Sequence, residues 1–286
     1  MNNRFDFEDK IDISWCPGCG NFSIRKELLS VIEEMSLERK DLVLVSGIGQ
    51  AAKMPEFINS SFFHGLHGRG LPAATAIKAA NPQLTVIAFG GDGDMYGEGG
   101  NHLLHTIRKN PDITLFVHDN MVYGLTKGQA SPTSSLGMKT PLQVFGVADQ
   151  PLNPLALAIS LDVTFVARAF SGHIEQTKEI MKQAMAHKGF ALVDIFQPCV
   201  SFNKINTYKW FSENTYYLPA DFDNSDRVKS FEKALEQDPF PLGVIYQSNH
   251  RKTLEDNLKV YKNSKDPLYK REVNLQKVEE VIKARR

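Results

Sequence analysis

Hydrophobic positions follow helical and extended patterns in turn over the first two hundred residues. Apolar residues recur at the spacing of one helix face between positions 22 and 35, which predicts an amphipathic helix: Ile24, Leu28, Val31, Ile32 and Met35. The run DLVLVSG that follows is short and apolar and ends in glycine, so it predicts a buried strand. The first part of the pattern therefore predicts a helix followed by a buried strand.

The same alternation continues to about residue 197. Residues 72–80 open with proline and are followed by Asn81-Pro82, which predicts a helix, and the apolar run LTVIAFGG predicts the next strand. A glycine-rich loop, GGDGDMYGEGG, precedes further helices and strands in the segments NHLLHTIRKN, ITLFVHDN, DVTFVARAF, HIEQTKEIMKQAMAH and FALVDIFQ. Unbroken apolar strands between helices predict an α/β fold with a doubly wound, mostly parallel sheet and a ligand crevice at the carboxyl ends of its strands.

The pattern loosens after Pro198. An aromatic-rich segment follows, and the charged end QKVEEVIKARR predicts an arm or helix that packs on the domain or on a partner. We therefore divide the chain into an α/β domain, residues 1–200, and a C-terminal extension, residues 201–286.

The charge balance favours small-molecule chemistry. The 286 residues contain 33 Lys+Arg and 33 Asp+Glu, so no single-sign footprint for nucleic acid or an anionic membrane is expected. The N-terminus lacks the apolar core of a signal peptide, and no run reaches the roughly 18 apolar residues of a spanning helix. We expect a cytoplasmic protein. Three cysteines in such a chain indicate metal ligation or burial and not a disulfide framework.

Two polar residues at strand ends suggest a metal site. Asp92 lies between glycines after LTVIAFGG, and Asn120 follows 28 positions later after ITLFVHDN. One right-handed βαβ unit brings such strand ends together, and carboxylate and amide oxygens are ligands of Mg²⁺. Gly90, Gly91 and Gly93 would let backbone N–H groups approach diphosphate oxygens. Without further context, two polar loops that merely end two strands remain an alternative.

Two other motifs are ambiguous on their own. Cys16-Pro-Gly-Cys19 has a spacing that suits zinc, a redox pair or another metal centre. The loop VSGIGQAAK matches G-x-G-x-x-A after a strand, but the stretch FFHGLHGRG, where a ribose-binding acid would lie, contains none. A nicotinamide-dinucleotide site is therefore disfavoured. His102 and His105 lie on a predicted amphipathic helix and receive no role.

Several segments together resemble one family. Gly91-Asp92-Gly93 with Asp119-Asn120 is similar to the thiamine-diphosphate motif, and the segments 15–21, 67–73 and 123–129, with the lone Cys199, resemble the β subunits of 2-oxoacid:ferredoxin oxidoreductases. The resemblance runs from about residue 14 to about residue 210. It implies a thiamine-diphosphate-binding domain of the pyrophosphate type.

The resemblance also implies site residues. Mg²⁺ would be held by Asp92, Asn120 and the carbonyl of Val122, and Lys53 would lie near the substrate carboxylate, with His67 as a catalytic contact. Cofactor contacts would come from four loops: Ile48, Gly49, Gln50, His67, Gly68, Arg69, Gly91, Gly93, Asp94, Gly124, Leu125 and Thr126. Lys53 could equally be a solvated lysine, and His67 and Arg69 could bind loop carbonyls. The acids Asp94 and Glu98 are expected to be solvated and not to replace the carboxylate that the family's α subunit supplies.

An iron–sulfur cluster is implied with one ligand missing. Cys16, Cys19 and Cys199 resemble the family's [4Fe–4S] ligands, but its Gly-Ile-Gly-Cys reads Gly47-Ile48-Gly49-Gln50 here. A non-thiolate ligand, a partner residue or solvent could complete the cluster. Alternatively, the cluster is labile or has been lost.

The resemblance implies oxidative decarboxylation of a 2-oxoacid with coenzyme A to acyl-CoA, CO₂ and reduced ferredoxin. It also implies that the enzyme is an αβ pair or its dimer and that this chain is inactive without the α subunit. The substrate could be pyruvate, 2-oxoglutarate, or a branched or aromatic 2-oxoacid, and the two-subunit architecture favours 2-oxoglutarate or broad specificity. The sequence does not identify the physiological electron acceptor. The main rival is a non-oxidative thiamine-diphosphate decarboxylase or carboligase without a cluster. The other rival interpretation is a scaffold subunit with structural zinc at Cys16 and Cys19.

Overall fold

The computed structural model of the chain describes residues 4–7 and 10–285. Within these residues, eight strands form one sheet in the order β2-β1-β3-β4-β8-β7-β10-β9. Every neighbouring pair is parallel except β10 and β7, which are antiparallel. The strands are β1 (Leu42–Ser46), β2 (Ser61–His64), β3 (Thr85–Gly91), β4 (Thr114–Asp119), β7 (Phe165–Phe170), β8 (Ala191–Phe196), β9 (Thr215–Tyr217) and β10 (Phe240–Gln247). A separate antiparallel pair consists of β5 (Val122–Tyr123) and β6 (Gln129–Ala130).

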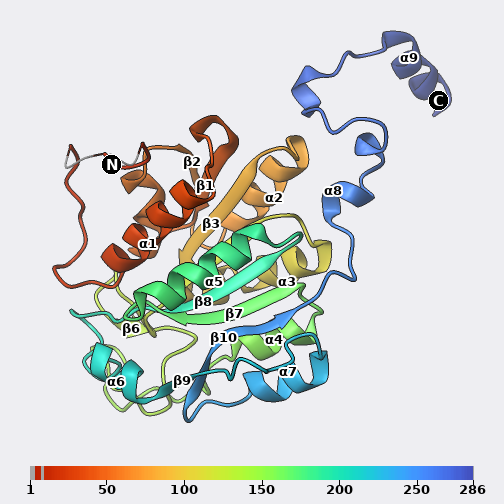
Figure 1. The fold of residues 1–286 in the computed structure, drawn as a ribbon. Coiled ribbons are helices and arrows are strands. Elements are labelled where there is room, and N and C mark those ends of the chain that lie inside the picture. Colours follow the sequence, from red (N-terminus) through yellow and green to blue (C-terminus); the bar gives the residue numbers. More distant parts are fainter. Residues whose placement is uncertain (1–3, 8–9, 286) are drawn as a thin grey trace.

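Helices cover both faces of the sheet (Figure 1). Two helices, α1 (Asn21–Glu34) and α5 (Ile174–Ala186), pack side by side on one face. Four others belong to the opposite face: α2 (Gly70–Ala80), α3 (Gly100–Lys109), α4 (Pro154–Ser160) and α7 (Arg227–Ala234). The predicted α/β fold with a mostly parallel, doubly covered sheet is confirmed.

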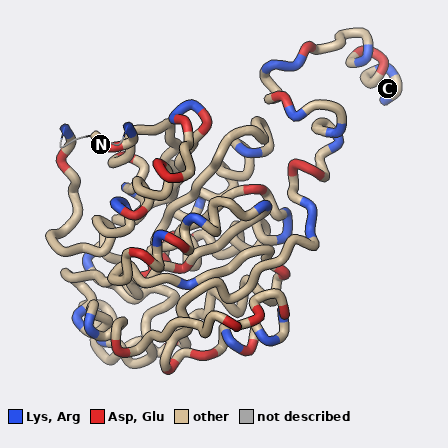
Figure 2. The backbone as a smooth tube through the Cα atoms, in the orientation of Figure 1, with Lys and Arg blue, Asp and Glu red and all other residues tan. Residues whose placement is uncertain are grey.

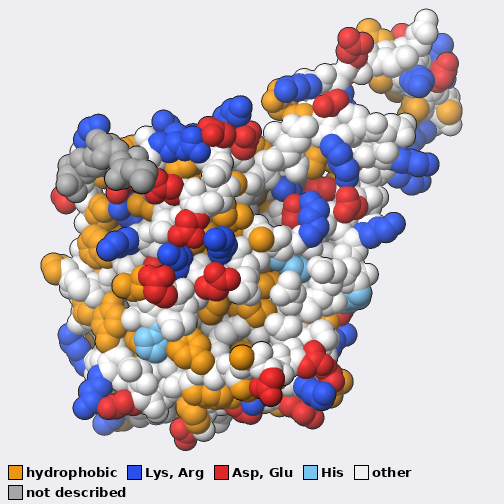
Figure 3. Space-filling view, in the orientation of Figure 1, with side chains coloured by type: hydrophobic (Ala, Val, Ile, Leu, Met, Phe, Trp, Pro, Cys, Tyr) orange, Lys and Arg blue, Asp and Glu red, His pale blue; other side chains and the backbone are white. Residues whose placement is uncertain are grey.

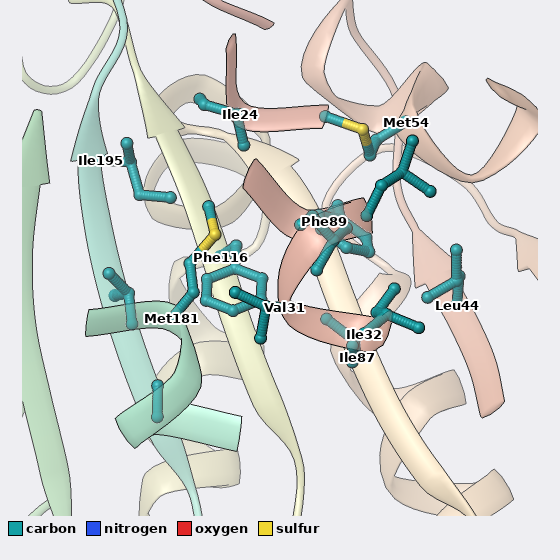
Figure 4. Packing of buried hydrophobic residues seen from close by; sticks show 14 of the residues in the cluster. Ile24, Val31, Ile32, Leu44, Met54, Ile87, Phe89, Phe116, Met181 and Ile195 are labelled. Atoms are coloured by element: carbon teal, nitrogen blue, oxygen red, sulfur yellow. The ribbon is translucent and has the colours of Figure 1, made fainter. Parts of the chain in front are cut away.

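Alternating strand residues supply the two cores. Ile87 and Phe89 of β3 point to the α1 side, whereas Val86 and Ala88 belong to the core under the opposite helices. Figure 4 shows the α1 side, where Met181 of α5 lies near Phe116 of the sheet. Burial of each large apolar side chain contributes about 1.5–3 kcal/mol. The strands are thus fixed from both sides, and so are the loops at their ends.

Local sequence sets the helix ends. The side chain of Asn153 accepts a hydrogen bond from the Ala156 N–H at the start of α4, where Pro154 is the first helical residue. Helix α3 ends at Lys109, and its C-cap residue Asn110 has a left-handed φ of 52°, a conformation that asparagine tolerates better than most residues. These signals place helix ends beside the loops that join them to the strands.

Two features differ from the sequence-based expectation. The glycine-rich segment predicted as a loop contains a π-helical turn, Gly93–Glu98, that leads into α3. Gly99 N donates to the Asp94 carbonyl at 2.8 Å, so this turn has helical hydrogen bonding. Its high glycine content is typical of a loop, which is why the sequence did not predict a helical turn. The sheet also continues beyond residue 200, because β10 pairs with β7 and β9 pairs with β10.

The C-terminal segment extends away from the sheet (Figure 1). It contains α8 (Leu254–Asn257) and α9 (Leu275–Lys283), while the short α6 (Tyr208–Glu213) lies near β9. None of the residues of α9 is buried, and its apolar side chains, which include Leu275 and Val281, are exposed. Figure 3 shows hydrophobic side chains on this arm, and Figure 2 shows Lys and Arg interspersed with Asp and Glu on the helices, the loops and the arm.

Candidate cofactor site

The predicted metal ligands meet at the carboxyl edge of the sheet. Asp92 follows β3 and Asn120 follows β4, and these strands are parallel neighbours. Both residues line one pocket together with Val122. The amide oxygen of Asn120 accepts a hydrogen bond from Val122 N at 3.1 Å. A carbonyl oxygen has a second lone pair, so Asn120 keeps an acceptor position for a cation.

Two hydroxyl groups hold the Asp92 carboxylate. Ser131 and Thr133 both donate to its Oδ2 atom, the Thr133 bond at 2.7 Å. Asp92 is buried, and burial raises the pKa of its carboxyl to about 6. The ionised form is therefore costly until a cation compensates it.

Buried acids around Asp92 outnumber buried bases. Thr133 Oγ1 also lies 2.8 Å from Oδ1 of the buried Asp119, and burial raises the pKa of Asp119 well above its usual range. Asp194 interacts electrostatically with both acids, while the Arg168 guanidinium binds Asp194 at 2.9 Å. Of the three carboxylates, only that of Asp194 is paired with this guanidinium. A divalent cation with oxygen ligands fits this charge excess.

Asp94 corrects one sequence-based expectation. It was expected to be solvated, but it is 2% exposed. Its Oδ1 atom accepts hydrogen bonds from Ile48 N at 3.1 Å and Gly68 N at 2.7 Å. The Nδ1 atom of His67 lies 2.8 Å from the same oxygen. A carboxylate that gathers backbone N–H groups from two loops is a structural anchor, whereas Glu98 of the same turn is exposed as expected.

Glycines keep the pocket open. A Cβ atom on Gly49 would meet no heavy atom within 4 Å, and one on Gly91 would meet only the His118 carbonyl, at 3.8 Å. Gly68 has φ +70°, and its Cβ would lie 2.4 Å from the Glu98 carbonyl carbon. Bare backbone therefore borders the open space at the first two positions, which suits diphosphate oxygens, and close packing requires glycine at the third.

Most of the predicted cofactor and metal residues line this pocket. They are Ile48, Gly49, Gln50, His67, Gly91, Asp92, Gly93, Asp94, Asn120, Val122, Gly124, Leu125 and Thr126. Gly68 and Arg69 do not line it, although Gly68 contributes its N–H to Asp94. Lys53 also lies outside the lining, and its Nζ atom donates to Ser14 Oγ at 3.2 Å.

The three cysteines line an adjoining pocket. Cys16 and Cys19 precede α1, and Cys199 follows β8. Gln50, Asn120 and Gly124 line both pockets, so the two sites share a wall. Among the described residues no three His, Cys, Asp or Glu side chains form a group for a single metal ion. A [4Fe–4S] cluster is larger than one ion and takes more widely spaced thiolates.

Sequence reasoning missed several residues of this region. Ser131 and Thr133 belong to no motif in the loop after β6, and their role follows only from their contacts with Asp92. Gln197 was also missed. Its amide accepts from Asn120 Nδ2 at 3.3 Å and donates to Cys19 Sγ at 3.4 Å, so it connects the two pockets. His105 of α3, to which the sequence assigned no role, lines neither pocket, and its Nδ1 atom lies 2.8 Å from Nη1 of Arg108.

Comparisons with known proteins agree with this geometry. A family model described as thiamine pyrophosphate enzyme, C-terminal TPP binding domain, matches residues 45–195. Another, which describes the C-terminal part of the pyruvate ferredoxin oxidoreductase beta subunit, matches residues 199–263. The 2-oxoacid:ferredoxin oxidoreductase subunit beta of Saccharolobus solfataricus is 44% identical over 258 residues, 85% of each chain. The chain belongs to the family of 2-oxoacid:ferredoxin oxidoreductase β subunits.

Further relatives extend the match along the chain. Subunit beta of 2-oxoacid:ferredoxin oxidoreductase 2 from Aeropyrum pernix is 38% identical over 265 residues, which cover 88% of this chain and 86% of the relative. A solved structure of 2-oxoglutarate:ferredoxin oxidoreductase from Magnetococcus marinus, with 2-oxoglutarate, coenzyme A and succinyl-CoA bound, has a TM-score of 0.91 at 34% identity. That match covers 99% of this chain and 96% of the other. The predicted family, enzyme class and thiamine-diphosphate-binding domain are confirmed.

Among the helices of the described residues, none is long and apolar enough to span a membrane.

Proposed function

We propose that this β subunit binds thiamine diphosphate through Mg²⁺ at Asp92, Asn120 and the Val122 carbonyl, and acts with an α subunit on a 2-oxoacid. The reaction is coenzyme A-dependent oxidative decarboxylation with ferredoxin as the electron acceptor. The main support for this proposal is the buried Asp92 carboxylate, which two hydroxyl groups orient at the edge of a glycine-lined pocket. When bound, thiamine diphosphate supplies the electron sink for loss of CO₂.

The chain's own residues position the cofactor. Asp94 ties the loop after β1 and the loop at Gly68 to the π-helical turn, so three loops hold a fixed arrangement around the pocket. Tyr123 OH donates to the Gly93 carbonyl at 3.3 Å and so fixes the turn directly after Asp92. Pre-organised loops lose little conformational freedom when the diphosphate binds. His67 and Lys53 are the proposed contacts for the reacting end of the cofactor and the substrate carboxylate.

Electrons would leave through a cluster at the three cysteines. Gln50, Asn120 and Gly124 line both pockets, which supports a cluster site directly beside the cofactor pocket. Short separation suits one-electron transfer from the cofactor site. We propose a [4Fe–4S] cluster there and ferredoxin as its partner at the surface, where Cys16 is exposed.

In this proposal the site is completed by the α subunit. No residue of helix α9 (Leu275–Lys283) is buried and its apolar side chains are exposed, and we propose that this arm contacts the α subunit. The arm would then stabilise the αβ pair without touching the cofactor pocket.

The test is an anaerobic assay of the β subunit purified with its partner. Ferredoxin reduction is measured with pyruvate, 2-oxoglutarate, and branched and aromatic 2-oxoacids, each with and without coenzyme A. We expect activity with at least one 2-oxoacid that requires coenzyme A and is lost in Asp92→Ala. The matched variant Asp149→Ala removes an exposed acid and should keep activity. Thiamine-dependent CO₂ release with aldehyde or carboligation products and no ferredoxin reduction would instead identify a non-oxidative enzyme.

A further inference from the structure

Four residues whose side chains can bind a metal line the pocket beside the cofactor site. They are Cys16, Cys19 and Cys199, together with Gln50 from the loop after β1. These donors come from segments far apart in the sequence, which only the fold brings together. The remaining lining includes the apolar side chains of Trp15, Val200 and Phe202.

The carboxamide oxygen of Gln50 lacks a partner. Its Oε1 atom is buried and accepts no hydrogen bond from the described part of the chain. A buried polar atom without a partner destabilises a fold, so such atoms in native proteins commonly face a ligand, water or ion. Gln50 lines both the cofactor pocket and the cysteine pocket, and in the cysteine pocket its neighbours include three thiols, which are ligands of a metal centre.

The loop fixes the position of Gln50. Gly49 has φ +117°, a conformation that turns the chain directly before Gln50. The indole Nε1 of Trp15 donates to the Gln50 carbonyl at 2.8 Å, and the Trp15 ring packs edge-on against Phe57 at 4.8 Å between centroids. Since Trp15 directly precedes Cys16, this bond ties the Gln50 loop to the cysteine segment.

The sulfur atoms already have hydrogen-bond donors that suit anionic ligands. Gln197 Nε2 donates to Cys19 Sγ at 3.4 Å, and Phe202 N donates to Cys199 Sγ at 3.4 Å. Cys16, Cys19 and Cys199 line the same pocket, and three thiolates side by side would require a cationic centre between them. Hydrogen bonds to sulfur are also a usual means of tuning iron–sulfur clusters.

We propose that Gln50 Oε1 binds the fourth iron of a [4Fe–4S] cluster whose other three irons are bound by the thiolates of Cys16, Cys19 and Cys199. This inference rests on the cluster in the proposed function. The bond is a donation from a neutral amide oxygen and involves no electron transfer. Compared with four thiolates, the cluster carries one negative charge less, so its reduction potential is higher. The unique iron is also the easiest to lose.

Matched variants test this assignment in the αβ complex, purified anaerobically from cells grown on ⁵⁷Fe. Gln50→Cys supplies a fourth thiolate, Gln50→Ala removes the donor, and Gln176→Ala changes an exposed glutamine on α5 as the control. The readouts are iron and sulfide content, Mössbauer spectra, the cluster's reduction potential, and the hyperfine coupling of the reduced cluster in H₂¹⁷O. Circular dichroism and co-purification with the partner report folding.

In the wild type and in Gln176→Ala, we expect one iron of the four to differ from the others in the Mössbauer spectrum, without ¹⁷O coupling from solvent. Gln50→Cys should make the four irons alike and lower the potential. Gln50→Ala should show ¹⁷O coupling at the unique iron or conversion to a [3Fe–4S] cluster.

Three results would overturn the assignment. Solvent ¹⁷O coupling in the wild type would show that water occupies the fourth position. An unchanged spectrum of the unique iron in Gln50→Ala, or an unchanged potential in Gln50→Cys, would show that Gln50 is not a ligand. A wild type with thiamine diphosphate but no iron would exclude the cluster itself, and 2-oxoacid turnover in the same sample would report separately whether the cofactor site functions.

Discussion

Acidification is expected to weaken Mg²⁺ binding because it protonates the carboxyl of Asp92. The pH range of this loss is set by the burial of that carboxyl, which raises its pKa. Burial raises the pKa of this carboxyl from 3.8 to about 6, whereas Mg²⁺ requires the ionised form. Affinity should therefore be constant well above pH 6 and fall below it. With a pKa of about 6 the affinity at pH 5 is about tenfold weaker than at pH 7, whereas a carboxyl of ordinary pKa would lose almost nothing.

The same shift predicts the stability of the metal-free protein. A raised carboxyl pKa favours the protonated folded state, so its contribution to stability is present below pH 3.8 and is lost as the pH rises through about 6. The rise of the Asp92 pKa from 3.8 to about 6 corresponds to about 3 kcal/mol. Mg²⁺ should restore this stability above pH 6 and have little effect near pH 4.

The assay is calorimetric titration of the αβ complex with Mg²⁺ at saturating thiamine diphosphate, from pH 5 to pH 8. Ser131→Ala removes a hydrogen bond that lowers the Asp92 pKa, so its window should move to higher pH. The control is Ser225→Ala, because Ser225 donates a similar bond, 2.6 Å, to the exposed Asp223. An affinity that does not change between pH 7 and pH 5, or a window unmoved by Ser131→Ala, would refute the reasoning.

Three further substitutions test the account at other positions. Gly68→Ala should lower the free energy of unfolding by about 1–3 kcal/mol and weaken thiamine diphosphate binding in a titration, because the new Cβ would lie 2.4 Å from backbone. The control Gly100→Ala should bind thiamine diphosphate normally, because its Cβ would meet nothing within 4 Å. Asp94→Ala should destabilise the protein by about 3–6 kcal/mol through two lost backbone hydrogen bonds, with Asp94→Asn losing less; equal losses in thermal unfolding would contradict the anchor role. Glu27→Gln should stabilise the protein in thermal unfolding at pH 8, by up to about 4 kcal/mol, and not below pH 4.5, because burial raises the Glu27 pKa from 4.5 to about 8; a benefit at both pH values would point to another cause.

The sequence predicted what depends on local pattern. Apolar runs bounded by glycine located the central strands, and parallel pairing then required Asp92 and Asn120 to meet at one edge of the sheet. The thiamine-diphosphate motif and its surroundings named most residues of the pocket lining. Because the strand ends follow from these patterns, the sheet edge that carries the candidate site could be predicted without coordinates, whereas the order of the strands could not.

The missed features depend on contacts between distant segments. Asp94 looked like a solvated acid in a glycine-rich loop, but the backbone N–H groups of Ile48 and Gly68 reach it only in the folded chain. The hydroxyls of Ser131 and Thr133 have no sequence signature, since many loops contain such residues. No local spacing relates these donors to the acids that they bind.

The central claim is that Asp92 holds Mg²⁺ and thereby thiamine diphosphate at the carboxyl edge of the sheet. Equilibrium binding of thiamine diphosphate to the αβ complex, with Mg²⁺ and then with EDTA, tests it directly in the wild type, Asp92→Asn and the exposed-site control Asp149→Asn. The account predicts tight binding that requires Mg²⁺ in the wild type and in the control, and loss of that binding in Asp92→Asn. Equal, Mg²⁺-dependent binding by wild type and Asp92→Asn would contradict it.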